Sequence, residues 1–221
     1  MQFNAVLFDC DGVLVDSEPI SLNILRKMLA DLGWPLSYAE SKKIFVGKST
    51  KEEIDFIQKK LNRKLDEDWL QTFTVRRNQA LRQQLVAVPG IYDCLKQVRK
   101  KWPNLIACAS AAEKSKIMLQ LDKVGLTDFF TGRIFSGVDV ARNKPFPDVY
   151  ITAAHALGVD PKDCAIIEDS ITGITAGIQA GATVFAYCPD EEDHTPLQQA
   201  GAHHVFHQMQ QLPLLLQGHT S

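Results

Sequence analysis

Two aspartates that stand one residue apart are the first residues of this chain that could do chemistry. Asp9 and Asp11 lie in the segment Asp9-Cys10-Asp11-Gly12, directly after an apolar run. Alternate residues of an extended chain point to the same side, so both carboxylates can face one ligand beyond the end of a strand. One carboxylate can act as a nucleophile that forms a covalent intermediate. The other can give a proton to a leaving oxygen and later take a proton from water.

Further polar side chains stand where later apolar runs end. Ser110 ends the second run, Lys144 precedes the helix after the third, and Glu168 and Asp169 end the fourth. Ligands bind at the carboxyl ends of parallel strands, so we expect these side chains to converge with the two aspartates. Four carboxylates repel one another, and the lysine supplies only one positive charge. Mg²⁺ balances such a cluster and prefers carboxylate, water and phosphate oxygens, so the cluster predicts a magnesium site that takes an anion.

The runs that position these residues alternate with helical patterns. Strands are predicted at residues 5–8, 105–109, 133–135, 164–167 and 183–186, with a short sixth strand at 204–206. Helical spacing is found between them, at residues 91–100, 114–123, 148–157 and 173–180. Strands that alternate with helices predict an α/β fold with a doubly wound, Rossmann-like parallel sheet.

The interval between residues 20 and 85 interrupts that alternation. It is rich in Leu, Lys, Glu and Gln and has apolar residues at helical spacing, for example Ile24 and Met28. No convincing strand occurs in it, so at least two helices must follow one another. We therefore expect an α/β core of residues 1–16 and 87–221, with an inserted helical domain at 17–86.

Composition limits the classes of partner. A formal net charge of -2 argues against a mainly electrostatic nucleic-acid binder. No apolar run is long enough to cross a bilayer, and no signal-like segment opens the sequence. The five cysteines are scattered without a Cys-x-x-Cys pair, which indicates reduced, structural thiols. We expect a cytoplasmic protein with neither a nucleic-acid nor a membrane partner, either a monomer or a weak homodimer.

The motifs, in this order, resemble those of the haloacid-dehalogenase-like superfamily over nearly the whole chain. Residues 8–17 are similar to its first motif and Ser110 to its second. Residues 144–148 are similar to the third motif and residues 167–170 to the fourth. The resemblance implies a Mg²⁺-dependent phosphate-monoester hydrolase, and it implies that the helical insert is a mobile cap domain.

The resemblance also implies a role for each motif residue. Asp9 would be the nucleophile and Asp11 the acid/base, while Mg²⁺ would bind Asp9, the backbone carbonyl of Asp11, and Asp169. Glu168 would lie beside the metal. Ser110 and Lys144 can hold the transferring phosphoryl oxygens, and Ala111 stands where many relatives carry a hydroxyl or an Asn, so its backbone would contact the phosphate.

Several reaction outcomes occur in the superfamily. Dehalogenases and phosphonatases lack the second aspartate, and Asp11 suits an alkoxide leaving group, which needs a proton. The β-phosphoglucomutase branch carries a His where this chain has Ser21, so we expect hydrolysis and keep the mutase as the alternative. An inactive sugar-phosphate-binding sensor is a more remote alternative, because all the motif residues are present.

The inserted domain carries the residues expected to select the substrate. The continuation at residues 16–18 resembles small sugar-phosphate and phosphogluconate phosphatases, so the expected partner is a small phosphorylated metabolite. Gly47-Lys48-Ser49 resembles the family's specificity loop, and Arg77 matches a cap cation that can meet a second anionic group. The plainer interpretation of Lys48 and Arg77 is a solvent-facing side chain.

Overall fold

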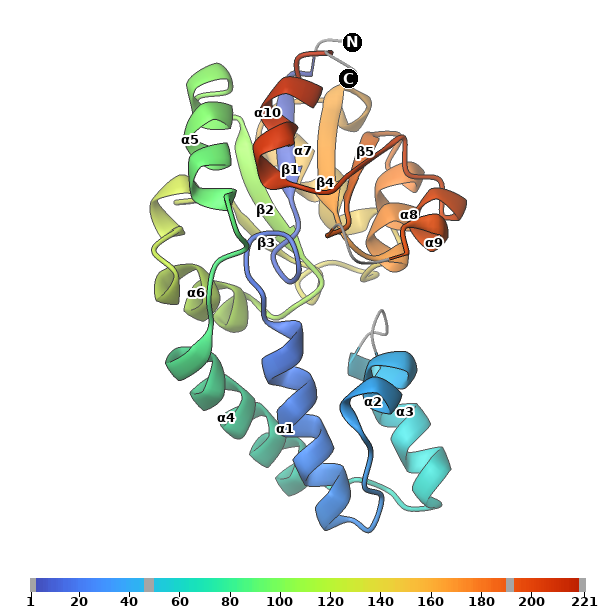
Figure 1. Ribbon diagram of the computed structural model, residues 1–221. Coiled ribbons are helices and arrows are strands. Elements are labelled where there is room, and N and C mark those ends of the chain that lie inside the picture. The colour runs from blue at the N-terminus through green and yellow to red at the C-terminus, as the bar shows by residue number, and fades with distance from the viewer. Residues whose placement is uncertain (1–2, 46–49, 190–192, 219–221) are drawn as a thin grey trace. The chain divides into compact units, whose positions relative to one another are not determined.

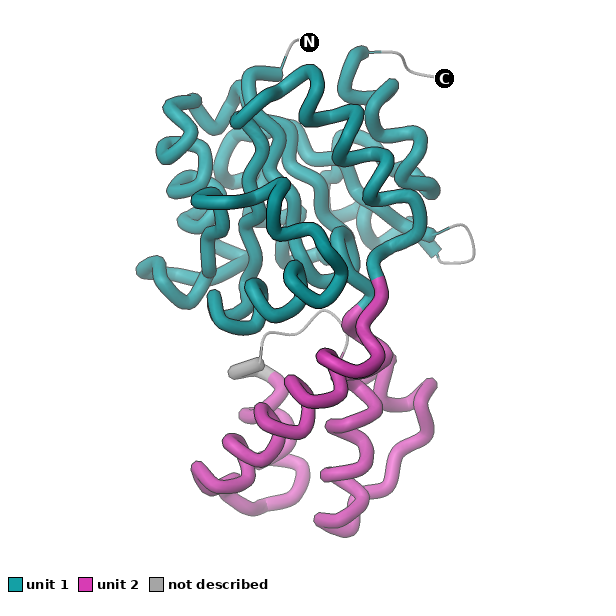
Figure 2. The backbone as a smooth tube through the Cα atoms, turned by 90° about the vertical axis from the view of Figure 1, so that its left-hand side faces the viewer, with its two compact units in different colours: residues 1–16, 87–221 teal, residues 17–86 magenta. Residues whose placement is uncertain are grey.

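Two compact units make up the chain. The computed structural model describes residues 3–45, 50–189 and 193–218 (Figure 1). One unit comprises Met1–Asp16 and Ala87–Ser221, and the other comprises Ser17–Val86 (Figure 2). In the described residues, no helix is long and apolar enough to cross a membrane.

The first unit is built on a six-stranded sheet in which every neighbouring pair is parallel. Its strands are β1 (Ala5–Phe8), β2 (Ile106–Ser110), β3 (Ile134–Ser136), β4 (Cys164–Glu168), β5 (Thr183–Tyr187) and β6 (His204–Phe206). Their order is β3-β2-β1-β4-β5-β6, so β1 lies in the middle between β2 and β4. The predicted doubly wound parallel sheet is confirmed, with strand ends within about one or two residues of the predicted ones.

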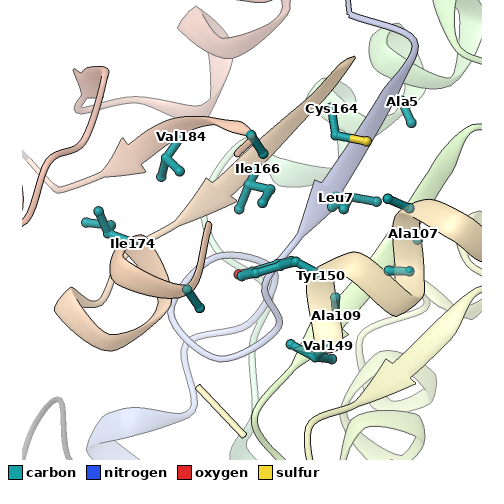
Figure 3. Packing of buried hydrophobic residues seen from close by; sticks show 14 of the residues in the cluster. Ala5, Leu7, Ala107, Ala109, Val149, Tyr150, Cys164, Ile166, Ile174 and Val184 are labelled. Carbon is teal, nitrogen blue, oxygen red and sulfur yellow. The ribbon is translucent and has the colours of Figure 1, made fainter. Parts of the chain in front are cut away.

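The helices of this unit follow the strands in alternation. They are α5 (Ile91–Lys101), α6 (Lys114–Lys123), α7 (Asp148–Ala156), α8 (Ile171–Gln179), α9 (Thr195–Gln199) and α10 (Leu212–Leu215), with short 3₁₀ turns at Thr127–Phe129, Pro161–Asp163 and Met209–Gln211. Inward residues of α7 and α8 pack on alternate residues of the central strands, for example Leu7 and Ile166 (Figure 3). The intervening residues Val6 and Phe8 are buried as well, which explains why β1 is a continuous apolar run.

The second unit consists of helices and the loops between them in its described residues. Its elements are α1 (Glu18–Asp31), α2 (Tyr38–Phe45), α3 (Thr50–Leu61) and α4 (Glu67–Gln84). Its own core contains Leu22, Leu25, Leu29, Phe45 and Ile57. The α4 helix begins at a side-chain cap, because Asp66 accepts a hydrogen bond from the Trp69 backbone N–H at 2.8 Å.

Candidate active site

Asp9 lies directly beyond β1, at the carboxyl edge of the sheet. Its backbone N–H continues the pairing with β4 by donating to the Ile167 carbonyl at 2.9 Å. The chain then turns sharply at Gly12, whose φ of 80° favours glycine. A Cβ at Gly12 would also collide with the Asp169 carboxylate, so the turn after β1 and the end of β4 meet closely. Asp9 itself is buried.

Lys144 joins the ends of three strands. Its Nζ lies 2.6 Å from Asp9 Oδ1, 2.7 Å from Glu168 Oε1 and 3.1 Å from the Ala109 carbonyl oxygen. The Lys144 side chain is only 3% exposed. Burial on its own lowers the pKa of this lysine, but the charges of the two carboxylates overcome that effect and raise the pKa above its usual value. Lys144 is therefore a fixed positive charge beside Asp9.

Glu168 is fully buried, and both its oxygens are occupied by donors. Oε1 accepts from Lys144 and from the Tyr150 hydroxyl at 2.8 Å. Oε2 accepts from the backbone N–H groups of Asp169 and Ser170, each at 3.0 Å, and from the Ser170 hydroxyl at 2.9 Å. Burial raises the pKa of Glu168, but the charge and hydrogen bond of Lys144 outweigh burial and lower it overall. Glu168 is thus an ionised anchor for Lys144.

Among the described residues, Asp9, Glu168 and Asp169 form a group that could hold a metal ion. Each offers a carboxylate oxygen, and these oxygens lie within 4.8 Å of one another. All the donors are oxygens, which fits a hard divalent cation such as Mg²⁺. Burial, together with the neighbouring charges of Glu168 and Asp11, raises the pKa of Asp9 to about 7 against the opposing effect of Lys144. A cation in the group would relieve that repulsion.

The Asp11 carboxylate is held by helix α6. Lys116 Nζ lies 2.9 Å from both carboxylate oxygens, and Gln120 Nε2 donates to Oδ1 at 2.7 Å. Sequence reasoning missed both residues. Their spacing of four residues was a usable signal, because such residues share one helix face, here next to the buried Ile117 and Leu121.

The end of β2 is tied to the loop that carries Lys144. Ser110 is buried, and its hydroxyl accepts a hydrogen bond from the Ala112 N–H at 3.2 Å. Asn143 donates to the Ala111 carbonyl at 2.8 Å and accepts from the Lys144 N–H at 2.8 Å. The third-motif loop is therefore fixed against β2. Asn143 and Tyr150 are two further residues around the site that the sequence did not reveal.

The residues expected to select the substrate belong to the other unit. Gly47, Lys48 and Ser49 lie outside the described residues. Arg77 lies on α4, where Nε and Nη2 donate to Asn78 Oδ1 at 3.2 and 3.1 Å. Its guanidinium also lies 5.6 Å from the ring centroid of Phe73. These contacts are all within its own unit.

Comparison with known proteins identifies the family. The family model described as haloacid dehalogenase-like hydrolase matches residues 3–181. The chain belongs to this family. It is therefore an enzyme of the hydrolase type, and the resemblance drawn from its motifs is confirmed.

Individual relatives match this hydrolase over most of its length. It is 31% identical to the 6-phosphogluconate phosphatase of Escherichia coli over 192 residues, which are 86% of this chain and 84% of the relative. It is 28% identical over 203 residues to the phosphorylated carbohydrates phosphatase of Thermotoga maritima, with 90% and 91% of the chains covered. A hydrolase of the same family from Deinococcus radiodurans, solved with bound phosphate and sodium, superimposes with a TM-score of 0.80 at 32% identity, covering 98% of this chain and 96% of the other.

Proposed function

We propose that this hydrolase is a Mg²⁺-dependent phosphatase that acts on phosphate monoesters of small metabolites, such as sugar phosphates or phosphogluconate. The observation that carries the proposal is Asp9 at the end of the central strand, paired with Lys144 and grouped with Asp169. A nucleophile, a fixed cation and a set of oxygen ligands at one point suit phosphoryl transfer. The phosphatase names of two relatives support the same reaction class and a carbohydrate phosphate as substrate.

Asp9 would attack phosphorus and form an aspartyl-phosphate. Its Oδ1 is engaged by Lys144, so Oδ2 is the oxygen proposed to attack. The leaving oxygen takes a proton from Asp11, and the Lys144 ammonium neutralises charge on the transferring group. Ser110 and the backbone at Ala111 are proposed to bind phosphoryl oxygens from the end of β2. Water then releases phosphate from Asp9.

The proposed metal ligands are Asp9, Asp169 and the Asp11 backbone carbonyl. Glu168 belongs to the same acidic group, but its two oxygens already accept five hydrogen bonds. We therefore place Glu168 beside the metal, where it fixes Lys144. When bound, Mg²⁺ would supply positive charge for the phosphate oxygens.

The test is phosphate release from p-nitrophenyl phosphate with and without Mg²⁺. Asp9→Asn should lower kcat by at least about a thousandfold, as expected for loss of a nucleophile. Asp122→Asn, an exposed aspartate on α6, is the matched control and should keep normal turnover. Substantial residual activity in Asp9→Asn would refute the nucleophile assignment, and absence of turnover in the unaltered protein would favour the sensor alternative.

A panel of phosphorylated metabolites ranked by kcat/KM would identify the substrate. The same panel separates hydrolysis from the mutase alternative, because a mutase returns the phosphoryl group to a second sugar hydroxyl instead of releasing it. We propose hydrolysis because α1 carries Ser21 where the resembled mutase branch carries a His. The substrate contacts of Gly47, Lys48, Ser49 and Arg77 remain part of this proposal.

A further inference from the structure

The Asp11 carboxylate accepts hydrogen bonds from two side chains that belong to none of the four motifs. Lys116 lies 2.9 Å from both Asp11 oxygens, and Gln120 donates to Oδ1 at 2.7 Å. Lys116 is well covered, with 13% of its side chain exposed, and Gln120 is fully buried. A pair in this setting is screened less by solvent than an ordinary surface ion pair. The contact can therefore determine where the carboxylate lies.

The two donors are themselves held in place. They stand one turn apart on α6, whose neighbouring residues Ile117 and Leu121 are buried in the unit's core. The Gln120 amide oxygen accepts from the Cys10 thiol at 3.6 Å, which leaves its amide nitrogen directed at Asp11. A rigid helix thus presents donors to the aspartate from a fixed direction, and this pre-organisation is what a catalytic group needs.

We propose that Lys116 and Gln120 are positioning residues that hold Asp11 as the proton acceptor in the second half of the reaction. This inference rests on the proposed phosphatase function. Both residues offer only N–H donors to Asp11, and an ionised carboxylate is the form that accepts all of them. Oδ1 accepts two of these bonds and Oδ2 accepts one, so Lys116 and Gln120 do not exhaust the acceptor capacity of Oδ2.

The step served by this arrangement is hydrolysis of the aspartyl-phosphate. The oxygen of water forms a bond to phosphorus while the bond from phosphorus to the Asp9 oxygen breaks. The electron pair of that bond returns to the Asp9 carboxylate, and one water proton passes to Asp11 Oδ2. The products are inorganic phosphate, free Asp9 and a protonated Asp11, which carries the proton that the next leaving oxygen needs.

The experiment compares Lys116→Met with the unaltered enzyme on p-nitrophenyl phosphate. The leaving group of this substrate needs little protonation, so the first half of the reaction depends weakly on Asp11. We expect kcat to fall about tenfold, within the range that a general base contributes. KM should fall by a similar factor because only the second step slows, and kcat/KM should stay within about twofold. Rapid mixing should then show a burst of p-nitrophenol equal to the enzyme concentration.

Companion variants keep this test decisive. Gln120→Met should lower kcat and KM together, by about one third of the factor expected for Lys116→Met. Lys116→Arg should keep most of kcat, because its guanidinium can still donate to the carboxylate. Lys114→Met removes an exposed lysine from the same helix and should leave both constants unchanged. A fall in kcat/KM equal to the fall in kcat, without a burst, would overturn the proposal, as would unchanged kcat in Lys116→Met.

Asp11→Asn separates failure of this inference from failure of the proposed function. Asp11→Asn should lower kcat and KM together, with little change in kcat/KM, and by a larger factor than Lys116→Met does. If Asp11→Asn accumulates the intermediate and Lys116→Met does not, the positioning role is wrong and the phosphatase mechanism stands. If neither Asp11→Asn nor Lys116→Met gives a burst, the acid/base role of Asp11 in the proposed function is wrong.

Discussion

At the scale of single residues, the balance of charges determines the protonation of the candidate site. Asp9 and Glu168 are buried beside one lysine, and Asp169 adds a further carboxylate within reach of both. Glu168 and Lys144 stabilise one another's charged forms. The pKa of Asp9 is raised to about 7, because burial disfavours its charged form and because Asp9 shares Lys144 with Glu168.

This balance predicts that Mg²⁺ affinity depends on pH. In the proposed site Mg²⁺ binds the ionised form of Asp9 more tightly than the protonated form, so metal and proton compete for the same carboxylate. With a pKa of about 7, Asp9 is mostly ionised at pH 8 and mostly protonated at pH 6. Isothermal titration at these two pH values should show affinity falling about tenfold on going down to pH 6.

The control for the pH effect is the Asp9→Asn variant. It has no carboxylate proton at this position, so its Mg²⁺ affinities at the two pH values should agree within about twofold. A tenfold difference that persists in Asp9→Asn would assign the pH dependence to another group.

The sequence predicted the residues that follow strands and missed those that reach the site from helices. Asp9 and Glu168 were found because a buried strand delivers its last residue to a known edge of the sheet. Lys116 and Tyr150 lie on helices, where the rotation of the helix about its axis decides which side chain faces the site. Hydrophobic periodicity locates the buried face, and the four-residue spacing of Lys116 and Gln120 places both on one face of the helix. Neither pattern shows which residue those side chains contact.

At the scale of elements, the start of α8 supports the site. Ser170 caps this helix by accepting from the Gly173 N–H at 3.1 Å, and its hydroxyl donates to Glu168. The Glu168 carboxylate lies against Gly173, where a Cβ would collide with it. The sequence pattern predicted that this helix begins at residue 173. The cap places the beginning at Ile171 instead.

Gly173→Ala should therefore damage the site in spite of alanine's better helix propensity. The added methyl group should displace Glu168, which would loosen Lys144 beside Asp9. We expect the free energy of unfolding to fall by about 1–3 kcal/mol, as for overpacking elsewhere. We also expect kcat on p-nitrophenyl phosphate to fall about tenfold or more. Thermal unfolding and steady-state kinetics measure the two effects.

Gln179→Ala is the matched control on the same helix. Gln179 is exposed, so alanine there changes helix propensity without touching Glu168. This variant should keep both Tm and kcat. Normal kcat in Gly173→Ala would show that the position of Glu168 does not matter for turnover.

At the scale of the whole molecule, each unit has a core of its own, and the residues with proposed roles are divided between the two units. The unit with the parallel sheet carries Asp9, Lys144 and Asp169, while the helical unit carries Arg77. Periodicity of 3.6 residues predicted helices in residues 20–85, and the structure forms four of them there in its described part. The pattern did not show whether any polar side chain of those helices could bind substrate, because charged faces look alike whether they meet solvent or a ligand.

Arg77 gives the last prediction, since it tests whether the helical unit recognises the part of the substrate remote from the reacting phosphate. The Arg77 fork can bind a carboxylate or second phosphate through charge-assisted hydrogen bonds of about 1.5–3 kcal/mol. Arg77→Ala should therefore raise KM for phosphogluconate about tenfold or more and leave p-nitrophenyl phosphate unaffected. Arg76→Ala is the control, because Arg76 is exposed and pairs with Asp31 at 3.9 Å. Equal effects of Arg77→Ala on both substrates would assign Arg77 to the stability of its unit, where it contacts Asn78 and Phe73.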